Sequence, residues 1–125
     1  MNYLSTMSDI PEFATTVLES GQFYVPRPLM EHCLPEFGAN GVTAYALLLD
    51  RLRKPIDFIY KGQDDEGNIF IYFSNEDLAE ALNCSKTTVI SVKKILVQKH
   101  LIVEVKQGLG QPNRIYLTDE ILSYY

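Results

Sequence analysis

The residues with the clearest chemical potential lie between Ser85 and Lys99, where lysines stand among short hydroxyl side chains. The segment holds four lysines and no acidic residue: Lys86, Lys93, Lys94 and Lys99. Ammonium groups neutralise phosphates, while small hydroxyls and an isoleucine can approach base edges and thymine methyl groups. Taken alone, a solvated basic face would be the simpler explanation. The neighbouring elements therefore decide between a solvated basic face and a DNA-contacting one.

Helical geometry divides this segment into two faces. At about 100° per residue, Val89, Val92 and Leu96 fall within about 60° of one another and are expected to face the core. The opposite face carries Thr87, Ile90, Ser91 and Lys94, and Lys86 projects from the first turn. Lys93 lies at the border and fits either face. This division suits a helix that packs on one side and contacts DNA on the other.

The preceding residues predict a helix-turn-helix. Ser74 and Asp77 form an S-x-x-D capping box at the start of a helix over residues 75–82. Asn83-Cys84 should end this helix, and Ser85 should cap a second one that runs to about Lys99. Two helices joined by a three-residue turn are the arrangement in which the second helix can enter a major groove.

A terminal hairpin follows and adds a wing. Two β-branched runs, residues 101–106 and 114–118, flank a turn rich in Gly, Pro and Asn. Gly108 and Gly110 would let the backbone lie close to a phosphate or enter a minor groove. The fold class is therefore α+β, a winged helix-turn-helix domain with an N-terminal helical extension.

The predicted DNA-contacting residues come from the second helix and the wing, where Lys106 and Arg114 are expected to face each other. The full set is Ser85, Lys86, Thr87, Ile90, Ser91, Lys93, Lys94, Lys106, Gln107, Asn113 and Arg114.

The overall charge first argues against this interpretation. The 125 residues carry a formal net charge of −5, from 11 Lys and Arg against 16 Asp and Glu, whereas nucleic-acid-binding domains are usually basic. Residues 83–116, however, hold six positive side chains and the single acid Glu104. Phosphate contact is local, because charges beyond about 10 Å are largely screened at 0.1 M salt. The basic segment is thus sufficient.

The first twenty residues predict an amphipathic helix. Ser8 can cap it, Pro11 suits its first turn, and Gly21 can close it. Its apolar face would consist of Ile10, Phe13, Val17 and Leu18. A short terminal helix must bury such a face, either on its own domain or in a homodimer. Both possibilities stay open, and these four residues are the candidate dimer interface.

The middle of the chain supplies the remaining elements. Residues 23–25 predict a short strand, and residues 29–34 one or two helical turns. Asn40 is a candidate cap for a helix over residues 41–53, whose apolar face is Tyr45, Leu48, Leu49 and Leu52. The runs 56–60 and 69–73, on either side of a Gly- and Asp-rich stretch, predict a hairpin.

Sequence patterns for enzymes, metal sites and membrane spans are missing. Asp64-Asp65-Glu66 lacks the alternating ligands of a calcium loop, and His32 and His100 have no partner at catalytic spacing. Cys33 and Cys84 stand far apart without zinc-ligand spacing, which favours a reducing, cytoplasmic setting. We therefore expect no catalysis, no cofactor or metal, and no membrane insertion.

Three segments resemble one known family. The stretches YALLLDRL (residues 45–52), residues 73–102 and GLGQPNRIYL (residues 108–117) are similar to the N-terminal domain of plasmid replication initiator A proteins, the RepA_N family of Gram-positive bacteria. The resemblance covers residues 23–118. Residues 1–22 would then be the extension, and residues 119–125 a tail leading to a C-terminal domain absent from this chain.

This resemblance implies a winged-helix domain that binds repeats in a replication origin, usually as a dimer. It places Lys86, Thr87, Ser91 and Lys94 on the recognition helix, and Lys106 and Arg114 on the wing. Many relatives are basic where this chain has Gln111. The family's C-terminal domain is implicated in recruiting host replication factors, which would be further partners of the longer protein.

Two other functions remain compatible with the sequence. One is transcriptional regulation, because a helix-turn-helix reads an operator and an origin in the same way. The other is a protein-interaction winged helix in a replisome-loading assembly, with a contact surface rich in tyrosines. Those tyrosines would be Tyr24, Tyr45, Tyr60 and Tyr72.

Overall fold

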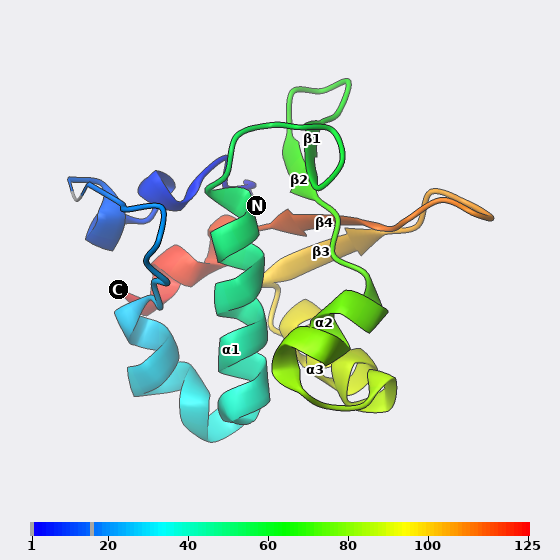
Figure 1. Ribbon diagram of the computed structural model, residues 1–125. Helices are drawn as coiled ribbons and strands as arrows, with labels where there is room; N and C mark the ends of the chain where they lie inside the picture. The colour runs from blue at the N-terminus through cyan, green and yellow to red at the C-terminus, as the bar shows by residue number, and fades with distance from the viewer. Residues whose placement is uncertain (1, 16) are drawn as a thin grey trace.

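The computed structural model describes residues 2–15 and 17–125 and has the mixed α+β architecture expected from the sequence. In chain order, the described helices and strands are α1 (Leu34–Leu52), β1 (Lys61–Gln63), β2 (Ile69–Ile71), α2 (Asn75–Leu82), α3 (Lys86–Gln98), β3 (Ile102–Val105) and β4 (Arg114–Leu117). The strands form one antiparallel sheet in the order β1-β2-β4-β3. Figure 1 shows α2, α3 and the β3–β4 hairpin on one side of α1, the C-terminus on the other, and the N-terminus beside the upper end of α1. The winged helix-turn-helix is thus confirmed.

Helix α1 is the centre of the core. Its predicted apolar face, Tyr45, Leu48, Leu49 and Leu52, is completely buried. Burial raises the pKa of the Tyr45 phenol. Because Tyr45 is inaccessible, it cannot belong to the tyrosine-rich protein-contact surface that the sequence had suggested. The helix packs against α2, α3 and β2, so it supports the winged helix from behind.

The helix-turn-helix forms where local signals placed it. The Ser74 hydroxyl accepts a hydrogen bond from the Asp77 amide at 3.0 Å and caps α2. Asn83 ends α2 in the left-handed conformation, with φ 52°, which asparagine tolerates better than most residues. Ser85 then accepts a bond from the Thr88 amide and caps α3.

The N-terminal extension is not the predicted amphipathic α-helix. It consists of two 3₁₀ turns, Met7–Asp9 and Pro11–Phe13. The Asp9 carboxylate accepts bonds from the amides of Ser5 and Thr6, so Thr6 rather than Ser8 precedes the first turn. The amide of Leu4 donates to the Leu117 carbonyl at 2.7 Å. The local Asp9 bonds and the bond from Leu4 to the domain outweigh the weak helix preference of a short segment.

Half of the predicted dimer surface is consequently internal. Ile10 and Phe13 are buried in this chain's own core. Leu18 packs against that core, while Val17 is exposed. Ile10, Phe13 and Leu18 therefore pack on the domain itself, one of the two alternatives that the sequence had left open, whereas Val17 does not.

Two further expectations for the first half of the chain are wrong. Residues 23–25 form no strand; instead the Tyr24 ring packs edge-on against Phe13, with 5.8 Å between centroids. The central helix is not capped at Asn40: a π-helical turn, Leu29–Cys33, leads into α1, which begins at Leu34. Gly38 interrupts α1 with a φ of 71°, a conformation that favours glycine, and the helix predicted for residues 41–53 follows this kink.

The predicted hairpin exists, but its first strand is displaced. The Asp57 carboxylate accepts bonds from the amides of Ile59, Tyr60 and Lys61, at 2.9, 2.8 and 3.1 Å. This turn occupies residues 57–61, so β1 pairs only from Lys61 onwards. The buried Lys61 ammonium donates to the carbonyls of Leu52 and Lys54 and satisfies the C-terminus of α1.

Candidate nucleic-acid interface

Helix α3 presents the face that its periodicity predicted. Val89, Val92 and Leu96 are buried. The exposed side carries Ser85 at the cap, then Lys86, Thr87, Ile90, Ser91 and Lys94. Ile90 is 57% exposed, so this face combines an accessible apolar side chain with hydroxyl and ammonium groups. Such a combination matches the chemistry of base edges and phosphates in a major groove.

Lys93 does not belong to this face. Its side chain is buried, and its ammonium group donates to the Glu104 carboxylate at 2.9 Å. The pair joins α3 to β3 and is largely shielded from solvent. Lys93 therefore has a structural partner, and we remove it from the candidate DNA-contacting residues.

The wing is a hairpin braced at its base. The Nε2 atom of Gln107 donates to the Pro112 carbonyl at 2.7 Å and to the Tyr72 hydroxyl at 3.3 Å. At the tip, the Gln111 amide donates to the Gly108 carbonyl. Gly108 and Gly110 both have positive φ, at 120° and 79°. The glycines thus make the turn that was predicted, while the Gln107 side-chain amide is already hydrogen-bonded to Pro112 and Tyr72.

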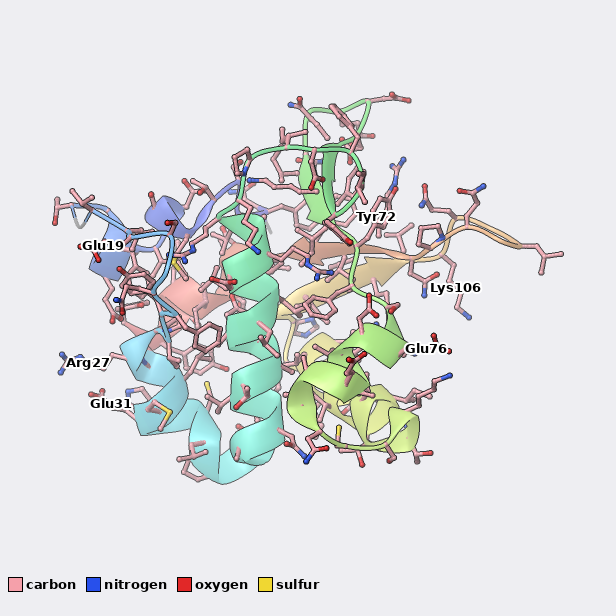
Figure 2. All side chains as sticks on the ribbon, viewed as in Figure 1. Glu19, Arg27, Glu31, Tyr72, Glu76 and Lys106 are labelled. Carbon is pink, nitrogen blue, oxygen red and sulfur yellow. The ribbon has the colours of Figure 1, made fainter. Side chains whose placement is uncertain are left out.

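Lys106 and Arg114 do not face each other. The strand register pairs Arg114 with Val105, and the Arg114 guanidinium lies over the Phe70 ring, 4.4 Å from its centroid. Lys106 is exposed and lines a groove shared with α3. Figure 2 shows Lys106 on the side of the wing that faces the helices. Only Lys106 of this pair joins the α3 surface.

A groove of about 530 Å³ runs between α3 and the wing. It is lined by Asn75, Ile90, Lys93, Lys94, Val97, Gln98, Glu104, Lys106 and Asn113. The sequence prediction missed Val97 and Gln98. Both lie three or four residues after Lys94, so helical spacing alone could have placed them on this side. Asn75 could be found only from the packing of α2 against α3.

Ion pairs reduce the positive charge of the basic segment. Lys86 contacts Glu76 at 2.7 Å and Lys99 contacts Glu36, in addition to the Lys93–Glu104 pair. The bond from Lys86 lowers the pKa of the Glu76 carboxyl. Among the residues that the structure describes, neither Lys94 nor Lys106 has an acidic partner. These two lysines, both on the groove, are the cations most available to phosphate.

The acidic cluster forms a hairpin turn. The Asp64 carboxylate accepts bonds from the amides of Glu66 and Asn68, and from the Tyr116 hydroxyl at 2.8 Å. The Tyr116 bond lowers the pKa of Asp64. Asp64 thus closes the β1–β2 connection and anchors it to β4.

None of the described helices is long and apolar enough to span a membrane.

This chain is similar to known proteins in both sequence and fold. The family model for the N-terminus of replication initiator protein A (RepA) matches residues 23–124. A "41 kDa protein" of Lactobacillus helveticus is 35% identical over 80 residues, which are 59% of this chain and 22% of that protein. The chain thus spans about a fifth of this relative.

Solved structures with a similar fold include DNA-binding and initiator proteins. One described as "N-Terminal domain of DNA binding protein" is 30% identical with a TM-score of 0.63, covering 88% of this chain and 80% of that one. "Structure of Rep-DNA complex" is 30% identical, with a TM-score of 0.60 and coverages of 88% and 81%. "Structure of MDR initiator" is 25% identical, with a TM-score of 0.60 and coverages of 88% and 83%. This chain belongs to the family of replication initiator protein A N-termini.

Proposed function

We propose that this domain binds double-stranded DNA at a plasmid replication origin, as the N-terminal part of a replication initiator. Helix α3 would lie in the major groove, with the wing on the neighbouring backbone or minor groove. The observation that carries the proposal is the groove lined by exposed α3 residues and by Lys106. Its one acidic lining residue, Glu104, is paired with Lys93. The family and the Rep-DNA complex among its structural neighbours support it.

The dimensions of α3 suit this role. A helix of 13 residues is about 20 Å long and, with side chains, about 10–12 Å wide. The major groove of B-DNA is about 12 Å wide. Because Val89, Val92 and Leu96 fix the helix on the core, its opposite side is the part that can enter.

The charge distribution favours approach by this side. The basic segment faces DNA, while the rest of the chain carries the excess of acids. Such asymmetry would repel the other surfaces from a duplex and orient the reading face. We propose a binding role rather than a catalytic one, supported by the family match and by the DNA-binding-protein domain among the structural neighbours.

The proposal is tested by fluorescence anisotropy with duplexes from the replicon's own origin. Lys94→Ala should weaken binding about tenfold and lower the salt slope by about 0.9, the value for one lost phosphate contact. Lys54→Ala is the matched control, since Lys54 is exposed on the α1–β1 connection. Equal affinity of both variants, or tighter binding of promoter duplexes than of origin repeats, would contradict the proposal.

We propose further that the domain acts as a homodimer, because repeated or palindromic sites are read by paired recognition helices. Ile10 and Phe13 are buried and cannot form the interface. The connection after α1 instead exposes Phe58 and Ile59, held in place by the Asp57 turn. Phe58→Asp should therefore give a monomer mass in light scattering. A dimer mass for this variant would exclude the surface.

Recruitment of host replication factors is a proposal for the longer protein only. The family relative is far longer than this chain, and a C-terminal domain of such a protein would carry this contact. Pull-down with the full-length initiator and with this domain would separate the two: binding by the domain alone would contradict the assignment.

A further inference from the structure

The tip of the wing carries a side chain that neither folding nor charge explains. Leu109 is fully exposed, although leucine is among the residues most often buried. It stands between Gly108 and Gly110, so no neighbouring side chain covers it. Its apolar surface is presented to whatever the wing touches.

The turn itself does not require leucine. The bond from the Gln111 amide to the Gly108 carbonyl closes a four-residue turn in which Leu109 is the first corner residue. The second corner, Gly110, has a φ of 79°, which is the conformation that demands glycine in a type II turn. The first corner accepts most residues, so the leucine has no conformational role there.

The surroundings suit an anionic groove. No acidic residue occurs between Val105 and Thr118, while Lys106 and Asn113 stand on the arms of the hairpin. The minor groove is about 6 Å wide, and paired strands lie about 4.8 Å apart between their axes, so the atoms of the two arms together are wider than the groove. Only the glycine-flanked tip is narrow enough to enter, and its one side chain must then meet the base edges.

The base of the wing is anchored to the rest of the domain. Gln107 is bonded to Pro112 and to Tyr72, and Arg114 is stacked on Phe70. Figure 2 places Tyr72 at this base, on the sheet. The hairpin is thus anchored to the domain at its root, while Leu109 is held at the far end.

We propose that Leu109 is an apolar wedge, which enters the minor groove beside the α3 site and partly unstacks one base step. Apolar side chains inserted in this way kink a duplex by about 20–90°. The domain would then bend its DNA as well as bind it. This inference rests on the proposed DNA binding and adds a deformation that binding alone does not require.

The test uses a duplex of about 30 base pairs, close to three helical turns, selected from a random-sequence library with the wild-type domain. Dyes at its two ends report bending by energy transfer, and 2-aminopurine at successive positions reports unstacking. Leu109→Ala is compared with Leu122→Ala, which removes the same atoms from an exposed leucine on the C-terminal 3₁₀ helix, Asp119–Tyr124.

The wild type and Leu122→Ala should both bend the duplex and raise 2-aminopurine fluorescence at one step. Leu109→Ala should lose both signals, bind about tenfold more weakly because the leucine is no longer buried, and keep its melting temperature. Bending by Leu109→Ala equal to wild type, or a wild-type complex without unstacking, would overturn the wedge while leaving DNA binding intact. If no duplex is selected, the proposed function itself fails.

Discussion

The neighbouring lysines Lys93 and Lys94 offer a sharp test, because one amino acid type occurs at two adjacent positions with opposite environments. Lys93 is buried against Glu104, with 2.9 Å between the ammonium and the carboxylate. Lys94 is exposed and has no acidic partner within the described residues. Methionine is also unbranched and is one atom shorter than lysine, so it removes the ammonium group and keeps most of the apolar stem. Lys93→Met should therefore change stability, and Lys94→Met should change DNA affinity.

The magnitude follows from burial. Removing one member of a buried ion pair costs about 3–5 kcal/mol. The Glu104 side chain keeps 22% of its exposure, and water can partly solvate it, so we expect about 2 kcal/mol for Lys93→Met. At an unfolding entropy of about 2.1 cal/mol/K per residue, this corresponds to a fall in Tm of about 8 °C. Lys94→Met should leave Tm within about 1 °C, as surface substitutions do.

Binding should show the reverse order. Lys94→Met is expected to weaken binding to an origin duplex about tenfold and to flatten the salt dependence by about 0.9. Lys93→Met should bind within about twofold of wild type at a temperature where both are folded. Calorimetry gives the Tm values and anisotropy titrations at several salt concentrations give the slopes. Equal losses of affinity, with unchanged Tm for Lys93→Met, would refute the assignment of Lys93 to the interior.

Three further predictions concern other contacts. Glu76→Gln should release Lys86 and raise affinity for duplex DNA about two- to threefold at low salt; an unchanged salt titration would show that Lys86 does not reach phosphate. Asp64 has a lowered pKa, so its contribution to stability is complete above the ordinary carboxyl pKa and lost as pH falls through the lower folded value. Asp64→Asn should therefore flatten the acid limb of thermal stability below about pH 4, and an unaltered limb would contradict this. Gly62→Ala would place a Cβ 2.7 Å from the Phe70 ring and should cost about 1–3 kcal/mol, whereas Gly21→Ala, which meets nothing within 4 Å, should not; equal denaturation midpoints would be evidence against the packing.

The parts predicted correctly depend on local signals. Ser74, Asn83 and Ser85 each fix the chain through a cap or a left-handed residue close to the bond they make. The glycines of the wing similarly determine their own turn. The helix-turn-helix and the hairpin were therefore visible in the sequence without knowledge of the rest of the fold.

The parts predicted wrongly depend on distant partners. The extension is held by the bond from Leu4 to Leu117, which no pattern within residues 1–20 reveals. The position of Arg114 depends on its register with Val105 and on the Phe70 ring. Hydrophobic periodicity identifies which side chains are buried, but it does not say against which neighbour they pack.

The charge of the basic segment shows the same limit. Counting along the chain separates positive and negative stretches, yet Lys86 and Lys99 are paired with Glu76 and Glu36 from earlier helices. Among the lysines of this segment, Lys94 and Lys106 are the two without an acidic partner within the described residues, and both line the groove. Spatial pairing, rather than the regional sum, identifies the surface that is available to DNA.

The central claim, that α3 reads the major groove of origin DNA, is tested most directly by methylation interference. Guanine N7 lies in the major groove, so methylating it should block binding at the bases that α3 contacts. Origin DNA of the replicon is methylated sparsely, incubated with the domain, and the bound and free fractions are cleaved at methylguanine. The account predicts guanines excluded from the bound fraction at the same place in each origin repeat. Binding that is indifferent to N7 methylation throughout the origin would contradict it.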